Sequence, residues 1–162
     1  MWSLELKTNS IQKDVGSLIG VNWGAVVNRT YVFGIGVAAN LSHNVTNYSY
    51  FHLVAQYIPE ADKLLHYGGQ IGFGFGTVKD YEHAKTNMLD NFLNTSGTAF
   101  YFVEPQLNAE LNVTTIAKLV LGLSYSLAFG LNEQNHSIAK SRVTNQDLSG
   151  VNVTIGVKLG RY

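Results

Sequence analysis

The 162-residue sequence lacks cysteine, contains only two prolines and is poor in charge. Without cysteine, neither a disulfide framework nor a thiolate metal site can form. Charged residues make up 14% of the chain, against roughly 25% in a typical soluble domain. The 11 basic side chains balance the 11 acidic ones, so no net field would attract a nucleic acid.

Long hydrophobic runs are also missing. No stretch approaches the roughly 20 apolar residues that a membrane helix requires. The chain starts with Met1, Trp2 and Ser3 and goes directly into alternating charged and apolar residues, without the basic and apolar regions of a secretory signal. If the protein is exported, we expect its leader to have been removed.

What the sequence does contain is a strong alternation of apolar and polar residues, which is typical of β-strands with two different faces. The clearest example is 101–113, where Tyr101, Val103 and Leu107 alternate with Glu104 and Gln106. Eight segments alternate in this way: 3–9, 15–27, 31–41, 48–58, 65–76, 101–113, 118–129 and 150–161.

The connections between these segments alternate in length. Asn28-Arg29, 59–63 and 114–116 are short, whereas 10–14, 42–47, 80–98 and 132–149 are longer and polar. This pattern is typical of membrane barrels, with short turns at one end and longer loops at the other. We therefore predict an all-β fold for 1–162 as a single domain, an eight-stranded antiparallel up-and-down transmembrane β-barrel.

The polar face is predicted to line the lumen, because much of it is glycine. Glycine makes a poor solvent-exposed sheet surface but suits the narrow interior of an eight-stranded barrel. Carboxylates in that interior need cationic partners. Lys118 and Glu110 flank the turn at 114–116 and are the best candidate pair. The predicted lumen network consists of Glu104, Gln106, Asn108, Glu110, Lys7, Lys118 and Lys158.

Aromatic residues fall near both ends of the apolar face, as in the interfacial girdles of membrane barrels. This arrangement predicts a lipid bilayer as the partner of the outer surface. The predicted girdle near the short turns is Tyr31, Phe33, Tyr57 and Tyr67, and that near the longer loops is Tyr48, Phe75, Tyr101 and Phe129.

Several strand and turn motifs carry a family resemblance, among them Gly20-Val21-Asn22-Trp23-Gly24, Phe33-Gly34-Ile35-Gly36 and Leu121-Gly122-Leu123-Ser124-Tyr125. With these motifs the chain resembles small outer-membrane barrels of the OmpA/OmpX type, and more closely the outer-membrane β-barrel proteins of Bacteroidota-type envelopes. The resemblance implies a place in the bacterial outer membrane. It also implies an assembly signal at an aromatic C-terminal residue; Tyr162 fits by type, although the alternation points it inward.

No catalytic, cofactor or metal site is predicted. Glu104 and Glu110 share a face but lie about 20 Å apart along a strand, too far for a catalytic pair. The histidines show no metal-binding spacing. Loop residues His83 with Asp80, and His136 near Glu133, leave a hydrolase site open as a remote alternative.

The predicted function is a structural, anchoring or interaction role in the envelope, with possible partners among other outer-membrane proteins. Such a barrel would present 80–98 and 132–148 to the outside. The sequence leaves two alternatives open, a narrow pore or small-ligand conduit and a soluble lipocalin-like carrier. Eight strands leave little lumen, which argues against an open channel.

Overall fold

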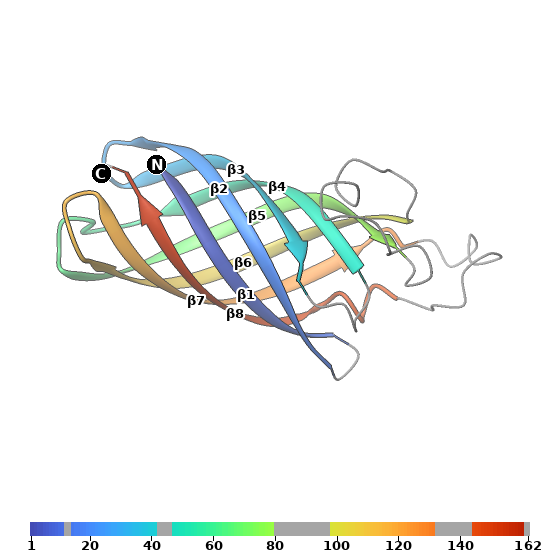
Figure 1. The fold of residues 1–162 in the computed structure, drawn as a ribbon. Coiled ribbons are helices and arrows are strands. Elements are labelled where there is room, and N and C mark those ends of the chain that lie inside the picture. The colour runs from blue at the N-terminus through green and yellow to red at the C-terminus, as the bar shows by residue number, and fades with distance from the viewer. Residues whose placement is uncertain (12–13, 42–46, 80–97, 132–143, 161–162) are drawn as a thin grey trace.

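The computed structural model describes residues 1–11, 14–41, 47–79, 98–131 and 144–160. These residues form a closed all-antiparallel barrel of eight strands, each hydrogen-bonded to its neighbours in chain order (Figure 1). The first and last strands close the barrel through pairs from Trp2↔Leu159 to Asn9↔Asn152. Within the described part of the chain there is no helix long and apolar enough to cross a membrane.

The eight strands agree with the eight alternating segments in number and order, and their bounds are mostly wider. They are β1 Trp2–Ile11, β2 Asp14–Val27, β3 Tyr31–Asn40, β4 Asn47–Tyr57, β5 Leu65–Lys79, β6 Thr98–Asn112, β7 Ala117–Phe129 and β8 Gly150–Leu159.

The first hairpin corrects one predicted loop. We expected a connection at 10–14, but pairing between β1 and β2 continues to Ile11↔Asp14. Backbone pairing therefore runs past the point where the side-chain alternation weakens, because the ladder depends on main-chain groups and not on side-chain polarity.

The short turns lie at one end of the barrel, together with both termini (Figure 1). They span 28–30, 58–64 and 113–116. In the first, Asn28 and Arg29 both have positive φ, 52° and 56°. Two successive left-handed residues match the twist of a tight hairpin, and asparagine tolerates this conformation better than most residues.

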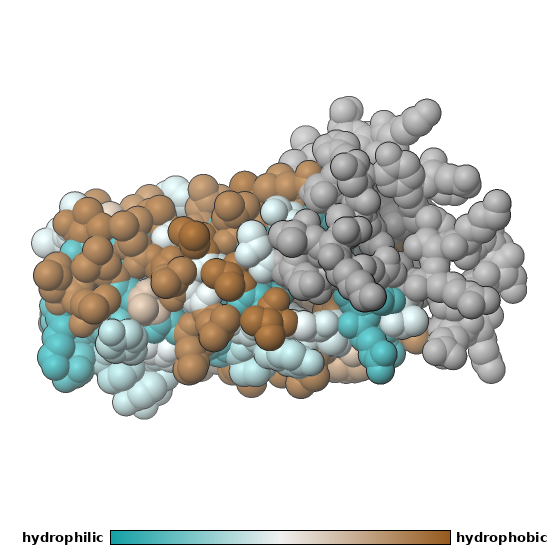
Figure 2. Space-filling view, turned by 90° about the horizontal axis from the view of Figure 1, so that it is seen from below, coloured by the Kyte–Doolittle hydropathy of each residue, from teal (hydrophilic) through white to brown (hydrophobic). Residues whose placement is uncertain are grey.

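The outer face of the strands is apolar, as the alternation predicts, and the inner face carries polar and small side chains together with a group of buried aromatic and aliphatic ones. On β7, Leu123 is 55% exposed whereas the adjacent Ser124 is 4% exposed. On β6, Phe102, Glu104 and Gln106 are buried, while Tyr101 and Leu107 are exposed. Apolar residues cover much of the strand region on the face seen in Figure 2. The buried core is therefore the lumen itself.

Candidate functional site: the filled lumen

An aromatic cluster fills the lumen toward the loop end. Tyr50 and Phe102 meet edge to face with ring centroids 4.7 Å apart, and Tyr48 meets Phe100 at 6.4 Å. All four side chains are at least 93% buried. We call this the aromatic plug; it comprises Tyr48, Tyr50, Phe100 and Phe102, with Leu18, Val78, Leu131 and Leu148 packed in the same cluster.

The plug fits because β5 presents glycines to the lumen between β4 and β6. A Cβ on Gly76 would lie 2.6 Å from the Phe100 ring, and one on Gly74 would lie 2.8 Å from the Phe102 ring; each would lie still closer to a backbone carbonyl oxygen of β4, that of Ser49 or Phe51. The pattern Gly72-x-Gly74-x-Gly76 is thus partly explained by aromatic side chains that lie over the strand. No helix follows these glycines in the described structure, so the arrangement is not a phosphate-binding loop.

On the side of the plug that faces the short turns, Lys7 and Glu104 form a buried ion pair across the barrel. Lys7 Nζ lies 2.6 Å from Glu104 Oε1 and 3.2 Å from the Tyr50 hydroxyl, to which it donates a hydrogen bond. The hydroxyls of Ser124 and Ser126 each donate to Glu104 at 2.7 Å. Lys7 therefore joins the polar network to the aromatic plug.

A second ion pair lies nearer the short turns. Glu110 is fully buried, and its Oε1 lies 2.7 Å from Lys158 Nζ and accepts a 2.6 Å hydrogen bond from Gln56. His66 Nε2 lies 3.4 Å from Glu110 Oε2. Lys118 Nζ lies 3.4 Å from the same His66 nitrogen and donates to the Ala61 carbonyl at 3.3 Å.

The seven residues named for the lumen network all lie on the inner face. Glu104, Gln106, Asn108 and Glu110 form one buried stripe on β6. The sequence singled out Lys118 as the best partner of Glu110, whereas the 2.7 Å ion pair of Glu110 is with Lys158. The register places Lys118 opposite Asn112 and Lys158 opposite Lys118, so both lysines lie two residues closer to the turn than Glu110, and the side-chain contacts decide which of them forms the ion pair.

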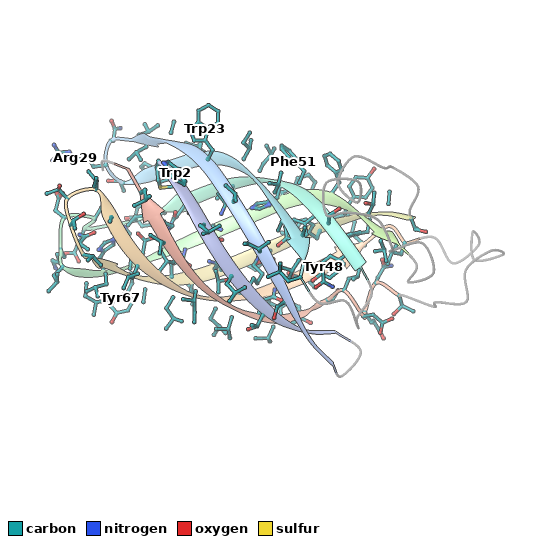
Figure 3. The ribbon with its side chains drawn as sticks, in the orientation of Figure 1. Trp2, Trp23, Arg29, Tyr48, Phe51 and Tyr67 are labelled. Carbon is teal, nitrogen blue, oxygen red and sulfur yellow. The ribbon has the colours of Figure 1, made fainter. Side chains whose placement is uncertain are left out.

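Tyr48 was wrongly assigned to the loop-side girdle. It is 6% exposed and belongs to the aromatic plug. Its position has the same parity as the inward His52, and a strand places such residues on one face. Figure 3 shows Tyr48 within the outline of the barrel and Tyr67 outside it. The seven other girdle aromatics point outward and are 43–65% exposed.

Several lumen residues had not been assigned a role from the sequence, notably Tyr50, Gln56, His66, Phe100 and Ser126. Each shares strand parity with a residue that was placed on the inner face, so parity was the available signal. Parity could not predict which side chains these residues contact, because the contacts join different strands. His83, Asp80, His136, Glu133 and Tyr162 lie outside the described residues.

The polar and aromatic groups leave little space in this part of the lumen. A cavity of about 20 Å³ lies between the aromatic plug and the polar network. Lys7, Glu104 and Asn152 line it on the side of the polar network. The cavity has room for about one water molecule. The described residues contain no group of three or more histidine and acidic side chains arranged to hold a metal ion.

Comparison with known proteins gives one similar solved structure. The N-terminal β-barrel domain of OprF from Pseudomonas aeruginosa aligns with a TM-score of 0.62 at 12% sequence identity, covering 98% of this chain and 95% of that one. No family model and no curated protein matches the sequence. The chain therefore has the eight-stranded fold of an outer-membrane barrel of the OmpA type. The narrower resemblance to Bacteroidota proteins stays a prediction.

Proposed function

We propose that this protein is an integral outer-membrane barrel with a structural or anchoring role, and that its lumen does not conduct. Its outer face supports membrane insertion, because large apolar side chains are exposed on every strand. Soluble monomers rarely expose contiguous apolar patches of such extent. One example from each strand, in order, is Leu4, Trp23, Phe33, Leu53, Phe73, Leu107, Leu123 and Ile155, all 48–72% exposed.

The observation that carries the non-conducting role is the filled lumen. The aromatic plug occupies the loop end, and the ion pairs Lys7–Glu104 and Lys158–Glu110 occupy the sections below it. A permeating ion would have to separate these buried pairs and pass the packed rings. Separating a buried pair leaves an uncompensated charge, which costs about 3–5 kcal/mol.

The two alternatives find less support. A narrow conduit needs a continuous water path, whereas the cavity between plug and polar network is about 20 Å³. A lipocalin-like carrier needs an apolar interior able to take a ligand and a polar exterior. Here the charged side chains of Glu104, Glu110 and Lys158 are inside, the inward aromatic rings pack against one another, and the outer face is apolar.

Two measurements test the proposal. The protein should fold in detergent or lipid and not in plain buffer; a monodisperse folded sample without detergent would contradict membrane insertion. Reconstituted into planar bilayers, it should show no steady conductance. The conductance of a variant with both Phe100 and Phe102 replaced by alanine, which lacks two plug rings, provides the matched comparison. Steady conductance of the unmodified protein would favour the conduit.

Envelope partners are the remaining part of the proposal. A non-conducting barrel contributes to the envelope by anchoring or by contacts with other proteins at its ends or outer wall. Chemical cross-linking in native membranes, followed by mass spectrometry of the cross-linked peptides, tests this role. Reproducible cross-links to one envelope protein would support it, and an absence of protein cross-links would leave a purely structural barrel.

A further inference from the structure

A groove crosses the outer wall of the barrel between two rows of outward side chains. The strand register aligns Tyr31, Tyr57, Gly69 and Leu107 in one row. The other row lies two residues farther from the turn end on each strand and consists of Phe33, Ala55, Ile71 and Pro105. The groove between them continues to Leu123 and Tyr125 on β7, and its open volume is about 680 Å³.

Small residues make this groove. In the second row, the side chains of Ala55 and Pro105 are short and project little from the wall. In the first row, Gly69 has no side chain and leaves a gap between Tyr57 and Leu107. No atom lies within 4 Å of the position that a Cβ of Gly69 would occupy. The opening at Gly69 is therefore real space on the outer wall and is not filled by neighbouring side chains.

The groove rises from the turn end of the barrel toward the middle of its wall. Tyr31 is the first residue of β3 and Tyr57 the last of β4, whereas Leu107 and Leu123 lie inside β6 and β7. From β3 to β7 it crosses four strand spacings, about 19 Å. With strands tilted by about 35–45°, that path rises roughly 12 Å along the barrel axis. This depth is close to half of the roughly 30 Å hydrocarbon core of a bilayer, which is one leaflet.

The lower end of the groove carries groups that suit a lipid headgroup. The Tyr31 and Tyr57 rings pack together with centroids 5.4 Å apart, and tyrosines favour the interface between headgroups and hydrocarbon. Arg29 is exposed in the turn that leads into Tyr31 and lies at the turn end of the barrel (Figure 3). An exposed guanidinium at that level matches the charge and geometry of a phosphate.

We propose that the groove holds one acyl chain of a phospholipid from the turn-side leaflet, with the lipid phosphate at Arg29. The chain enters beside Tyr31 and Tyr57, passes over Gly69 and ends near Leu107 and Leu123. This site rests on the proposed membrane location. The groove runs without interruption from the membrane interface to the middle of the barrel wall, because small residues line it. This shape favours one bound acyl chain over general contact with lipid.

The test uses a phospholipid with a photoreactive group in its acyl chain, incorporated with the protein into phospholipid vesicles. Labelled residues are identified by mass spectrometry. We expect labelling to concentrate on Tyr57, Ile71 and Leu107. Gly69→Leu fills the open position and should reduce this labelling severalfold. Val21→Leu enlarges an outward side chain on β2, outside the groove, and should leave it unchanged.

The headgroup contact is tested with Arg29→Asn, because asparagine tolerates the left-handed conformation at this position. The substitution should reduce labelling by the photoreactive phospholipid severalfold. It should not change labelling by a diacylglycerol with the same photoreactive chain, because that lipid has no phosphate. Equal labelling of the variant and the unmodified protein by the phospholipid would overturn the headgroup assignment.

Other outcomes separate this proposal from the membrane location. Uniform labelling around all eight strands would overturn the groove site and leave the membrane location intact. Groove labelling that falls as the protein-to-lipid ratio rises, while other outward residues stay labelled, would assign the groove to a contact between two copies of the chain. A complete lack of lipid labelling on outward residues would contradict membrane insertion itself.

Discussion

Glu110 and Lys158 form an ion pair of 2.7 Å in which both side chains are almost completely removed from solvent. Glu110 lies on β6 and Lys158 on β8, and the residues opposite Glu110 on β7 and β8 are Val120 and Gly156. A Cβ on Gly156 would lie 2.9 Å from the Glu5 side chain, so Glu5 occupies the inner face of β8 at this level. The carboxylate of Glu110 receives its cation from a strand two places away in the barrel.

Replacing Glu110 alone with glutamine should destabilise the barrel by about 3–5 kcal/mol, because Lys158 would keep its charge in a buried site. The double variant Glu110→Gln with Lys158→Met should recover most of that loss. Urea titrations in one lipid system measure both. Glu60→Gln removes an exposed pair with Lys63 and should cost no more than about 1 kcal/mol. A double variant as unstable as the single one would contradict the pair.

The two ion pairs should act independently. Glu104 and Glu110 lie six residues apart on one strand, about 20 Å. The effects of Lys7→Met and Lys158→Met on the free energy of unfolding should therefore add to within about 0.5 kcal/mol in the double variant. The same urea titrations provide the measurement. A strong departure from additivity would indicate one coupled network along the lumen.

The glycines of β5 should differ in their tolerance of a methyl group. Gly76→Ala places a Cβ 2.5 Å from the Ser49 carbonyl oxygen and 2.6 Å from the Phe100 ring and should cost about 1–3 kcal/mol through overpacking. Gly72→Ala is the control on the same strand and face. Its Cβ would meet its nearest neighbour at 3.7 Å, so it should be neutral or slightly stabilising. Thermal unfolding in detergent compares them, and equal losses would contradict the close packing of the Phe100 ring and the β4 backbone on Gly76.

The cost of an outward arginine should depend on its depth in the bilayer. Leu123 lies in the middle of β7, so Leu123→Arg should destabilise the barrel by about 2–4 kcal/mol. Leu64 is also outward, 69% exposed, but lies in a turn beyond the strands. Leu64→Arg should therefore have little effect in the same unfolding titration. If both variants lose the same stability, the bilayer does not surround the barrel at the level of Leu123.

Sequence alone predicted the strands, their order and the presence of an apolar outer and a polar inner face, because all three follow from local alternation and turn length. The inward positions of Glu104, Gln106, Asn108 and Glu110 needed only the parity of one strand. The error at Tyr48 was an error of parity, and the same rule corrects it. The aromatic side chain of Tyr48 suggested a place at the membrane interface, whereas strand geometry required that it point into the lumen.

The partners of these residues were decided by the tertiary structure. Lys7 and Glu104 are 97 residues apart in sequence, and Lys158 reaches Glu110 across 48 residues. Which charges meet depends on the register of every strand pair and on the tilt at which the barrel closes. The outer groove has the same origin, because Ala55, Gly69 and Pro105 are unrelated in sequence until the register aligns them. A local pattern fixes which side of a strand a residue occupies, and only closure of the barrel fixes what lies opposite it.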